Sequence, residues 1–103
     1  MNAFTLRLAA VPSELIGYVQ LSDATHAPRF DTYMEEAMYE RMVPGEGELP
    51  LREVLAILPR EVVVGLEIPQ RSLAEAGVGP HERLGRCVAA ARAMLAELPA
   101  ATA

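Results

Sequence analysis

Two polar side chains, Glu67 and Gln20, lie within short apolar runs, and both are of types that bind metal ions. Glu67 is the penultimate residue of the run VVVGLEI at residues 62–68. An ionised carboxylate in such a run is costly unless it is paired or bound to a metal. Gln20 lies in the run IGYVQLS at residues 16–22. Carboxylate and amide oxygens are ligands that hard divalent cations accept.

Both runs are predicted to be β-strands, because they are short, apolar and bounded by Pro or Asp. Side chains alternate between the faces of a strand, so Val63, Gly65 and Glu67 share one face, and Gln20 shares a face with Tyr18. Adjacent strands lie about 4.8 Å apart, so an amide and a carboxylate at matching depth could reach one ion. Two alternatives stay open. The carboxylate could reach solvent or an arginine, and the amide could be a hydrogen-bonded core or edge group.

The long connection between the two runs carries the other candidate residues. Arg41 precedes a tight turn, Pro44-Gly45-Glu46-Gly47. An arginine in the loop after a strand's C-terminal end could clamp an anionic or hydroxylated substrate, although a surface arginine beside a turn is an equal alternative. His26 lies in the same connection and is a second candidate for substrate contact. Asp23 is expected to be structural.

The remaining elements follow from proline positions and apolar spacing. We expect a helix over 51–58, with Pro50 at its first position, and a short helix near Thr32–Tyr39, whose Met34, Met38 and Met42 have the spacing of a packed face. Residues 4–11 fit either a helix or a strand. The longest helix is predicted over 80–98. Its apolar face is expected to contain Leu84, Val88, Ala91, Leu95 and Leu98.

Strand–helix alternation indicates a parallel α/β architecture. Two parallel strands need cover on both faces and further partners. We therefore expect that neighbouring strands are supplied by a longer parent chain or by another subunit.

Length, charge and cysteine content exclude several classes of protein. The chain has 103 residues, enough for one small domain, with a net charge of −5 and nine basic residues that are all arginine and scattered. A nucleic-acid binder usually shows a basic patch, so no nucleic-acid partner is expected. No apolar run approaches the roughly 20 residues of a membrane span, and no secretion signal is evident, so a cytoplasmic protein is expected. Cys87 is the only cysteine, so an intrachain disulfide is excluded. It is expected to be a small buried residue.

The order of four segments resembles the C-terminal end of the xylose isomerase-like TIM barrel superfamily, also called sugar phosphate isomerases/epimerases. These segments are VQLSDA, EAMYERMVPGEGELPL, VVVGLEIP and CVAAARAML. The resemblance extends from about Thr5 to Leu98, and its most specific part is the R-x-x-P-G-x-G turn between two strands. It implies that residues 1–103 form the C-terminal portion of a (β/α)8 barrel, with its last two strand–helix units and a preceding helix.

The resemblance also implies a site. In the family a divalent metal (Mg, Mn or Co) is held at the barrel mouth by four strand-end ligands, of which Gln20 matches the third and Glu67 the fourth. Glu67 would also be a catalytic base, and Arg41 matches a substrate-binding arginine. The reaction would move a proton on a sugar or hydroxy-ketone through an enediolate. Most epimerases of the family have His in place of Gln20, and Gln resembles the 3-dehydroshikimate dehydratase branch.

Two further classes are considered. The chain could be a non-catalytic fragment or subunit-interaction module that folds only against another subunit. An endonuclease of the same superfamily is disfavoured by the acidic balance and by the presence of only two histidines.

Overall fold

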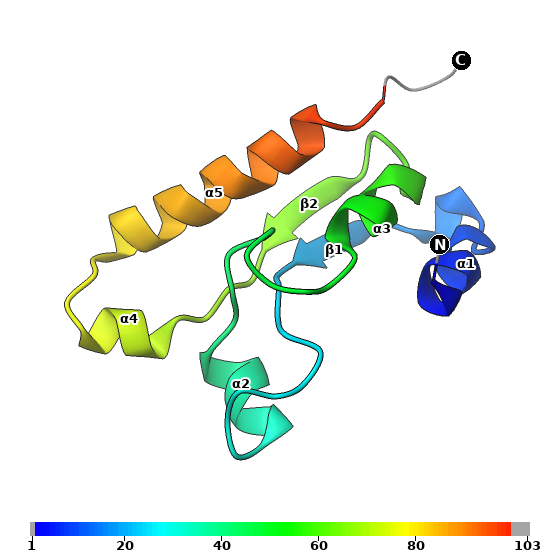
Figure 1. Ribbon diagram of the computed structural model, residues 1–103. Coiled ribbons are helices and arrows are strands. Elements are labelled where there is room, and N and C mark those ends of the chain that lie inside the picture. Colours follow the sequence, from blue (N-terminus) through cyan, green and yellow to red (C-terminus); the bar gives the residue numbers. More distant parts are fainter. Residues whose placement is uncertain (1, 100–103) are drawn as a thin grey trace.

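The computed structural model describes residues 2–99 as a mixed α/β arrangement around a small parallel sheet (Figure 1). The elements of this range, in chain order, are α1 (Ala3–Ala9), the 3-10 turn η1 (Ser13–Leu15), β1 (Tyr18–Leu21), α2 (Tyr33–Tyr39), α3 (Leu51–Ile57), β2 (Val63–Leu66), α4 (Arg71–Glu75) and α5 (Pro80–Ala96). The α/β class predicted from the sequence is therefore confirmed.

Strands β1 and β2 are parallel neighbours, as the apolar runs predict. Val19 pairs with Val64 and Leu21 with Leu66, and the main-chain pairing continues past the strand ends, where the Glu67 N–H donates to the Leu21 carbonyl at 3.4 Å. No third strand joins this sheet within the described part of the chain, so both of its edges are open there.

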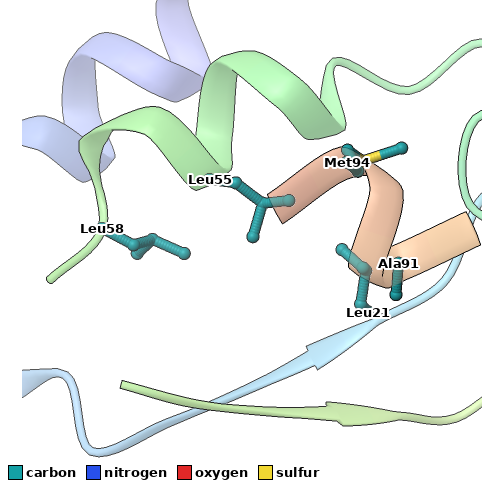
Figure 2. Packing of buried hydrophobic residues seen from close by; sticks show 5 residues of the cluster. All are labelled: Leu21, Leu55, Leu58, Ala91 and Met94. Carbon is teal, nitrogen blue, oxygen red and sulfur yellow. The ribbon is translucent and has the colours of Figure 1, made fainter. Parts of the chain in front are cut away.

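One face of the sheet is covered by helices α3 and α5, and the hydrophobic core lies beneath them. Leu21 of β1 packs with Leu55 and Leu58 of the α3 segment and with Ala91 and Met94 of α5 (Figure 2). Alternation along the strands places Val19, Leu21, Val64 and Leu66 on this covered face. The opposite face has no helix over it, and Tyr18 and Val63, which pair there, are mostly exposed.

The buried stripe of α5 differs from the predicted one. Cys87, Ala91 and Met94 are buried, whereas Leu84 is largely exposed and Leu95 partly so. The predicted stripe is confirmed for Ala91 and for Leu98, which is half-buried and packs against the core, and Val88 is half-buried. It is wrong for Leu84 and Leu95. The helix thus turns Cys87, Ala91 and Met94 inward, and Ala91 and Met94 belong to the core cluster.

The methionine face predicted around α2 is wrong. Met34 and Met38 are exposed, and the helix ends at Tyr39, before Met42. The helix itself forms as expected: Thr32 is its N-cap and accepts a hydrogen bond from the Glu35 N–H at 3.1 Å. An i, i+4 spacing aligns side chains on one face, but it does not say whether another element covers that face.

The N-terminal segment, ambiguous in the sequence, is helical. The side chain of Asn2 accepts a hydrogen bond from the Thr5 N–H at 2.8 Å and so caps α1. The Asn2 N–H in turn donates to Glu53 of α3 at 2.9 Å. Helix α4 is not predicted by the sequence pattern, because its five residues are too few to show a period.

None of the helices within residues 2–99 is both long enough and apolar enough to cross a membrane. The longest, α5, has 17 residues and carries charged side chains along its length.

The choice of buried face on α5 is testable by a matched pair of truncations. Met94→Ala should lower the free energy of unfolding by about 2–5 kcal/mol, because Met94 is 1% exposed and its loss leaves a cavity. Leu84→Ala should change it by less than about 0.5 kcal/mol, because Leu84 is 59% exposed. Urea unfolding followed by circular dichroism measures both. A larger loss for Leu84→Ala would show that the helix is rotated from the described position.

Candidate functional site

Gln20 and Glu67 lie on the same, uncovered face of the sheet. Gln20 pairs in register with Gly65, and residues opposite each other in a parallel sheet point to the same side. Glu67 follows Gly65 by two residues and therefore shares that side. From strand spacing, the two Cα atoms are about 8 Å apart on a diagonal. The two residues are therefore not at the matching depth that the sequence analysis expected, and the Tyr18 hydroxyl lies over Gly65 on the same face. A diagonal of this length still allows both side chains to reach toward one point above the sheet.

Both residues are exposed, and no hydrogen bond or ion pair of either side chain is present among residues 2–99. An apolar strand would make a buried Glu67 carboxylate costly. This cost does not arise among the described residues, because the face that carries Glu67 is exposed. The alternative of an arginine partner for Glu67 is not found within the described range.

Asp23, just beyond β1, organises the loop that follows. One carboxylate oxygen, Oδ1, accepts hydrogen bonds from the N–H groups of Ala24 at 2.8 Å and Leu49 at 3.1 Å. The other, Oδ2, accepts from Gly45 at 2.9 Å and Gly47 at 3.0 Å. Asp23 is 1% exposed, so these four donors replace the water that a carboxylate would otherwise bind. The sequence-based expectation that Asp23 is structural is confirmed.

The two glycines of the turn are required by this arrangement. Gly45 has φ +92°, in the left-handed region that side chains disfavour. A Cβ at Gly47 would lie 2.6 Å from both the Asp23 Cγ and the Ala24 carbonyl oxygen. The P-G-x-G sequence is therefore explained by a backbone that wraps closely around one buried carboxylate.

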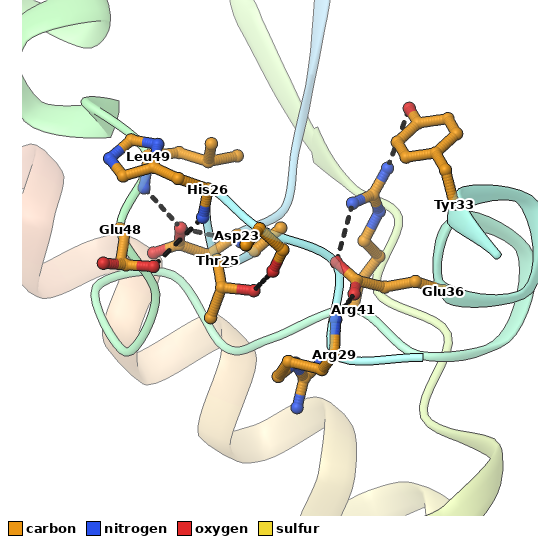
Figure 3. Close-up of polar contacts among 11 residues, drawn as sticks. Asp23, Thr25, His26, Arg29, Tyr33, Glu36, Arg41, Glu48 and Leu49 are labelled. Carbon is orange, nitrogen blue, oxygen red and sulfur yellow. Dashed lines mark hydrogen bonds and ion pairs between the residues drawn. The ribbon is translucent and has the colours of Figure 1, made fainter. Parts of the chain in front are cut away.

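Arg41 is held by contacts on both its backbone and its side chain. Its N–H donates to the Pro69 carbonyl at 2.8 Å, which fixes the loop against the segment after β2. The guanidinium Nη1 lies 3.8 Å from Glu36 Oε1. Nη2 donates to the Tyr33 hydroxyl at 3.4 Å (Figure 3). Arg41 is thus an oriented group at the C-terminal end of the sheet.

The neighbouring residue strengthens this anchor. Glu40 is buried, and its carboxylate accepts hydrogen bonds from the N–H of Ser72, at 2.8 Å, and from the Ser72 hydroxyl. The main chain of Glu40 also forms an antiparallel bridge with Gln70. The connection after β1 is therefore tied to the connection after β2.

His26 lines two neighbouring surface hollows. One, of about 270 Å³, also includes Tyr33, Glu36 and Arg41 in its lining. The other, of about 740 Å³, runs beside the open edge of β1 and includes Gln20. The two share His26 and Leu49. The structure thus brings Arg41 and His26 together and connects them to Gln20 along one surface, while Glu67 lines neither hollow.

Glu36 and Tyr33 are candidate site residues that the sequence does not single out. The Glu36 side chain is 3% exposed, against 41% for its neighbour Glu35, which pairs with Arg71 at 3.5 Å. Nothing in the sequence Glu35-Glu36 indicates which of the two carboxylates is buried. Only the path of the preceding loop, which brings the Arg29 N–H to 2.8 Å from Glu36 Oε2, decides which one is enclosed.

Other candidate chemistry is limited. Within residues 2–99, no group of three or more His, Cys, Asp or Glu side chains is placed to hold a metal ion. Cys87 lies on the buried side of α5, and this burial raises the pKa of its thiol above the usual value. A raised pKa keeps the thiol protonated and so does not favour a nucleophilic role.

In comparisons with known proteins, no protein-family model, no curated protein and no solved structure matches the chain. The superfamily resemblance therefore rests on the sequence segments alone, and the activity it implies is a proposal.

The role of Asp23 can be tested by replacing it with its amide. Asp23→Asn should destabilise the chain by about 2–4 kcal/mol, because an amide has one acceptor oxygen and would turn N–H groups toward the loop donors. Hydrogen exchange at the Gly45 and Gly47 amides should accelerate. Asp31→Asn, at an exposed aspartate, should change stability by less than about 0.5 kcal/mol. Equal stabilities for the two variants would contradict the described loop.

Proposed function

We propose that the chain forms the last two strand–helix units, with a preceding helix, of a xylose isomerase-like (β/α)8 barrel that acts as a metal-dependent sugar or sugar phosphate isomerase/epimerase in the cytoplasm. One observation carries the proposal. An amide, Gln20, and a carboxylate, Glu67, share the uncovered face of a parallel sheet near its C-terminal end, and neither side chain is paired within the described range. In a closed barrel that face would be the interior.

The donor set suits a divalent cation such as Mg²⁺, Mn²⁺ or Co²⁺. Glu67 offers an anionic oxygen and Gln20 a neutral one, the types that hard cations accept. Two ligands do not complete a coordination shell, so the remaining ligands would come from other strands of the barrel. A bound cation would stabilise the negative charge that develops on neighbouring substrate oxygens when a proton leaves carbon.

The protein groups then have separate tasks. Glu67 is a carboxylate on the open face and would accept the proton, in addition to binding the cation. Gln20 has no titratable group and would only orient. Arg41 and His26, which line one hollow beyond the strand ends, would bind substrate oxygens. A 3-dehydroshikimate dehydratase-like lyase would use the same proton removal followed by loss of hydroxide.

The barrel would have to be completed by strands from elsewhere in the same polypeptide or from another one. Both edges of the described sheet are open and one face is uncovered, which parallel sheets do not tolerate in isolation. We therefore expect no turnover from these residues alone.

The site is tested by adding Mn²⁺ to the ¹⁵N-labelled chain. Paramagnetic broadening should centre on the amides near Gln20 and Glu67. Glu67→Gln should weaken this binding at least about tenfold, because it removes the anionic ligand. Glu61→Gln, which alters an exposed carboxylate in the turn before β2, should leave this binding unchanged. Broadening that centres elsewhere and persists in Glu67→Gln would refute the metal site.

The second candidate is a non-catalytic fragment or subunit-interaction module. It is favoured by the exposure of Tyr18 and Val63, which lie side by side on the uncovered face. Sedimentation velocity separates the two candidates when it is combined with the Mn²⁺ titration. A stable oligomer without Mn²⁺ binding favours the interaction module. A monomer that binds Mn²⁺ at Glu67 favours the barrel enzyme.

A further inference from the structure

The hollow at Arg41 is small and has a defined polar wall. Its volume is about 270 Å³, and its lining includes His26, Tyr33, Glu36, Arg41 and Leu49. This is just below the roughly 300–1,000 Å³ of pockets for drug-sized ligands. The space therefore fits one end of a small ligand, and the charges of the wall decide which chemical group that end can carry.

The positive charge of Arg41 is already matched by a fixed carboxylate. Glu36 Oε1 lies 3.8 Å from Nη1, and the two side chains are only 3% and 17% exposed. Glu36 is oriented toward Arg41, because its other oxygen accepts a hydrogen bond from the Arg29 N–H at 2.8 Å. His26, on the other side of the hollow, is held by its backbone N–H, which donates to the carboxylate of Glu48 at 3.0 Å (Figure 3).

These contacts make the hollow a poor anion site and a good hydroxyl site. A phosphate or carboxylate that approached Arg41 would also approach the Glu36 carboxylate, which has little solvent to screen it. A neutral hydroxyl meets no such repulsion. It can accept from the guanidinium and donate to the Tyr33 oxygen or to Glu36. The Tyr33 ring, centred 5.6 Å from the Arg41 Cζ, offers an apolar face beside these polar groups.

We propose that this hollow binds an uncharged, hydroxylated end of a ligand, as in a free ketose, and selects against a phosphorylated end. The assignment of that ligand as a substrate rests on the proposed function. The binding preference rests only on Arg41, Glu36 and Tyr33, so a failure of the metal site would leave the preference intact, and the reverse also holds.

The preference is tested by NMR titration of the ¹⁵N-labelled chain with D-fructose, D-fructose 6-phosphate and inorganic phosphate, at constant ionic strength and with EDTA present. D-fructose should give saturable shifts at the amides of His26, Tyr33 and Arg41. The two phosphates should bind there at least about fivefold more weakly. The preference is overturned if D-fructose gives no saturable shifts, or if either phosphate binds there as tightly as D-fructose.

Matched variants test whether the Glu36 charge causes the weaker binding of phosphate. Glu36→Gln keeps an acceptor for the Arg29 N–H but removes the balancing charge, so binding of inorganic phosphate should tighten at least about fivefold. D-fructose binding should change by less than about twofold, because a hydroxyl does not depend on that charge. Glu35→Gln, at the more exposed neighbour that pairs with Arg71 rather than Arg41, should alter the binding of neither ligand. Unchanged phosphate binding in Glu36→Gln would overturn the charge-balance argument, and the wild-type comparison stands even if that variant does not fold.

Discussion

The arrangement beyond the strands depends on one buried carboxylate. Asp23 accepts four backbone hydrogen bonds and is itself paired through its main chain with Met42, by an N–H···O contact in each direction. The end of β1 is thereby joined to both ends of the P-G-x-G turn. Arg41 and Leu49 flank that turn, and His26 follows Asp23 by three residues. The positions of the groups around the smaller hollow thus depend on this interaction.

A second constraint is the one-sided cover of the sheet. Helices α3 and α5 bury one face, and the chain provides nothing within its described residues to cover the other. Gln20 and Glu67 lie on the uncovered face, near the C-terminal ends of the two strands. An uncovered face with these two side chains would suit the interior of a barrel. It would equally suit a surface that binds another subunit. The two proposals differ in what completes the face.

The charges around Arg41 refine the kind of chemistry that the loops can support. An arginine that follows a strand is commonly read as an anion clamp, but this one is paired with the buried Glu36. Binding at such a pair depends on hydrogen-bond geometry more than on net charge, since the local charge is close to balanced. A ligand recognised there would be distinguished by its hydroxyl groups. The metal-ligand candidates lie apart from this pair and would act on a different end of the ligand.

The sequence by itself determined the α/β class, the positions of both strands and three helices to within about two residues, and which side chains of each single strand share a face. These follow from local rules, because strand alternation and proline punctuation operate over a few residues. The tertiary structure alone decided that Met94 rather than Leu84 is buried and that Glu36 rather than Glu35 is enclosed. It also decided that Asp23 collects four donors from residues up to 26 positions away. Burial depends on which distant element covers a face, and no local pattern carries that information.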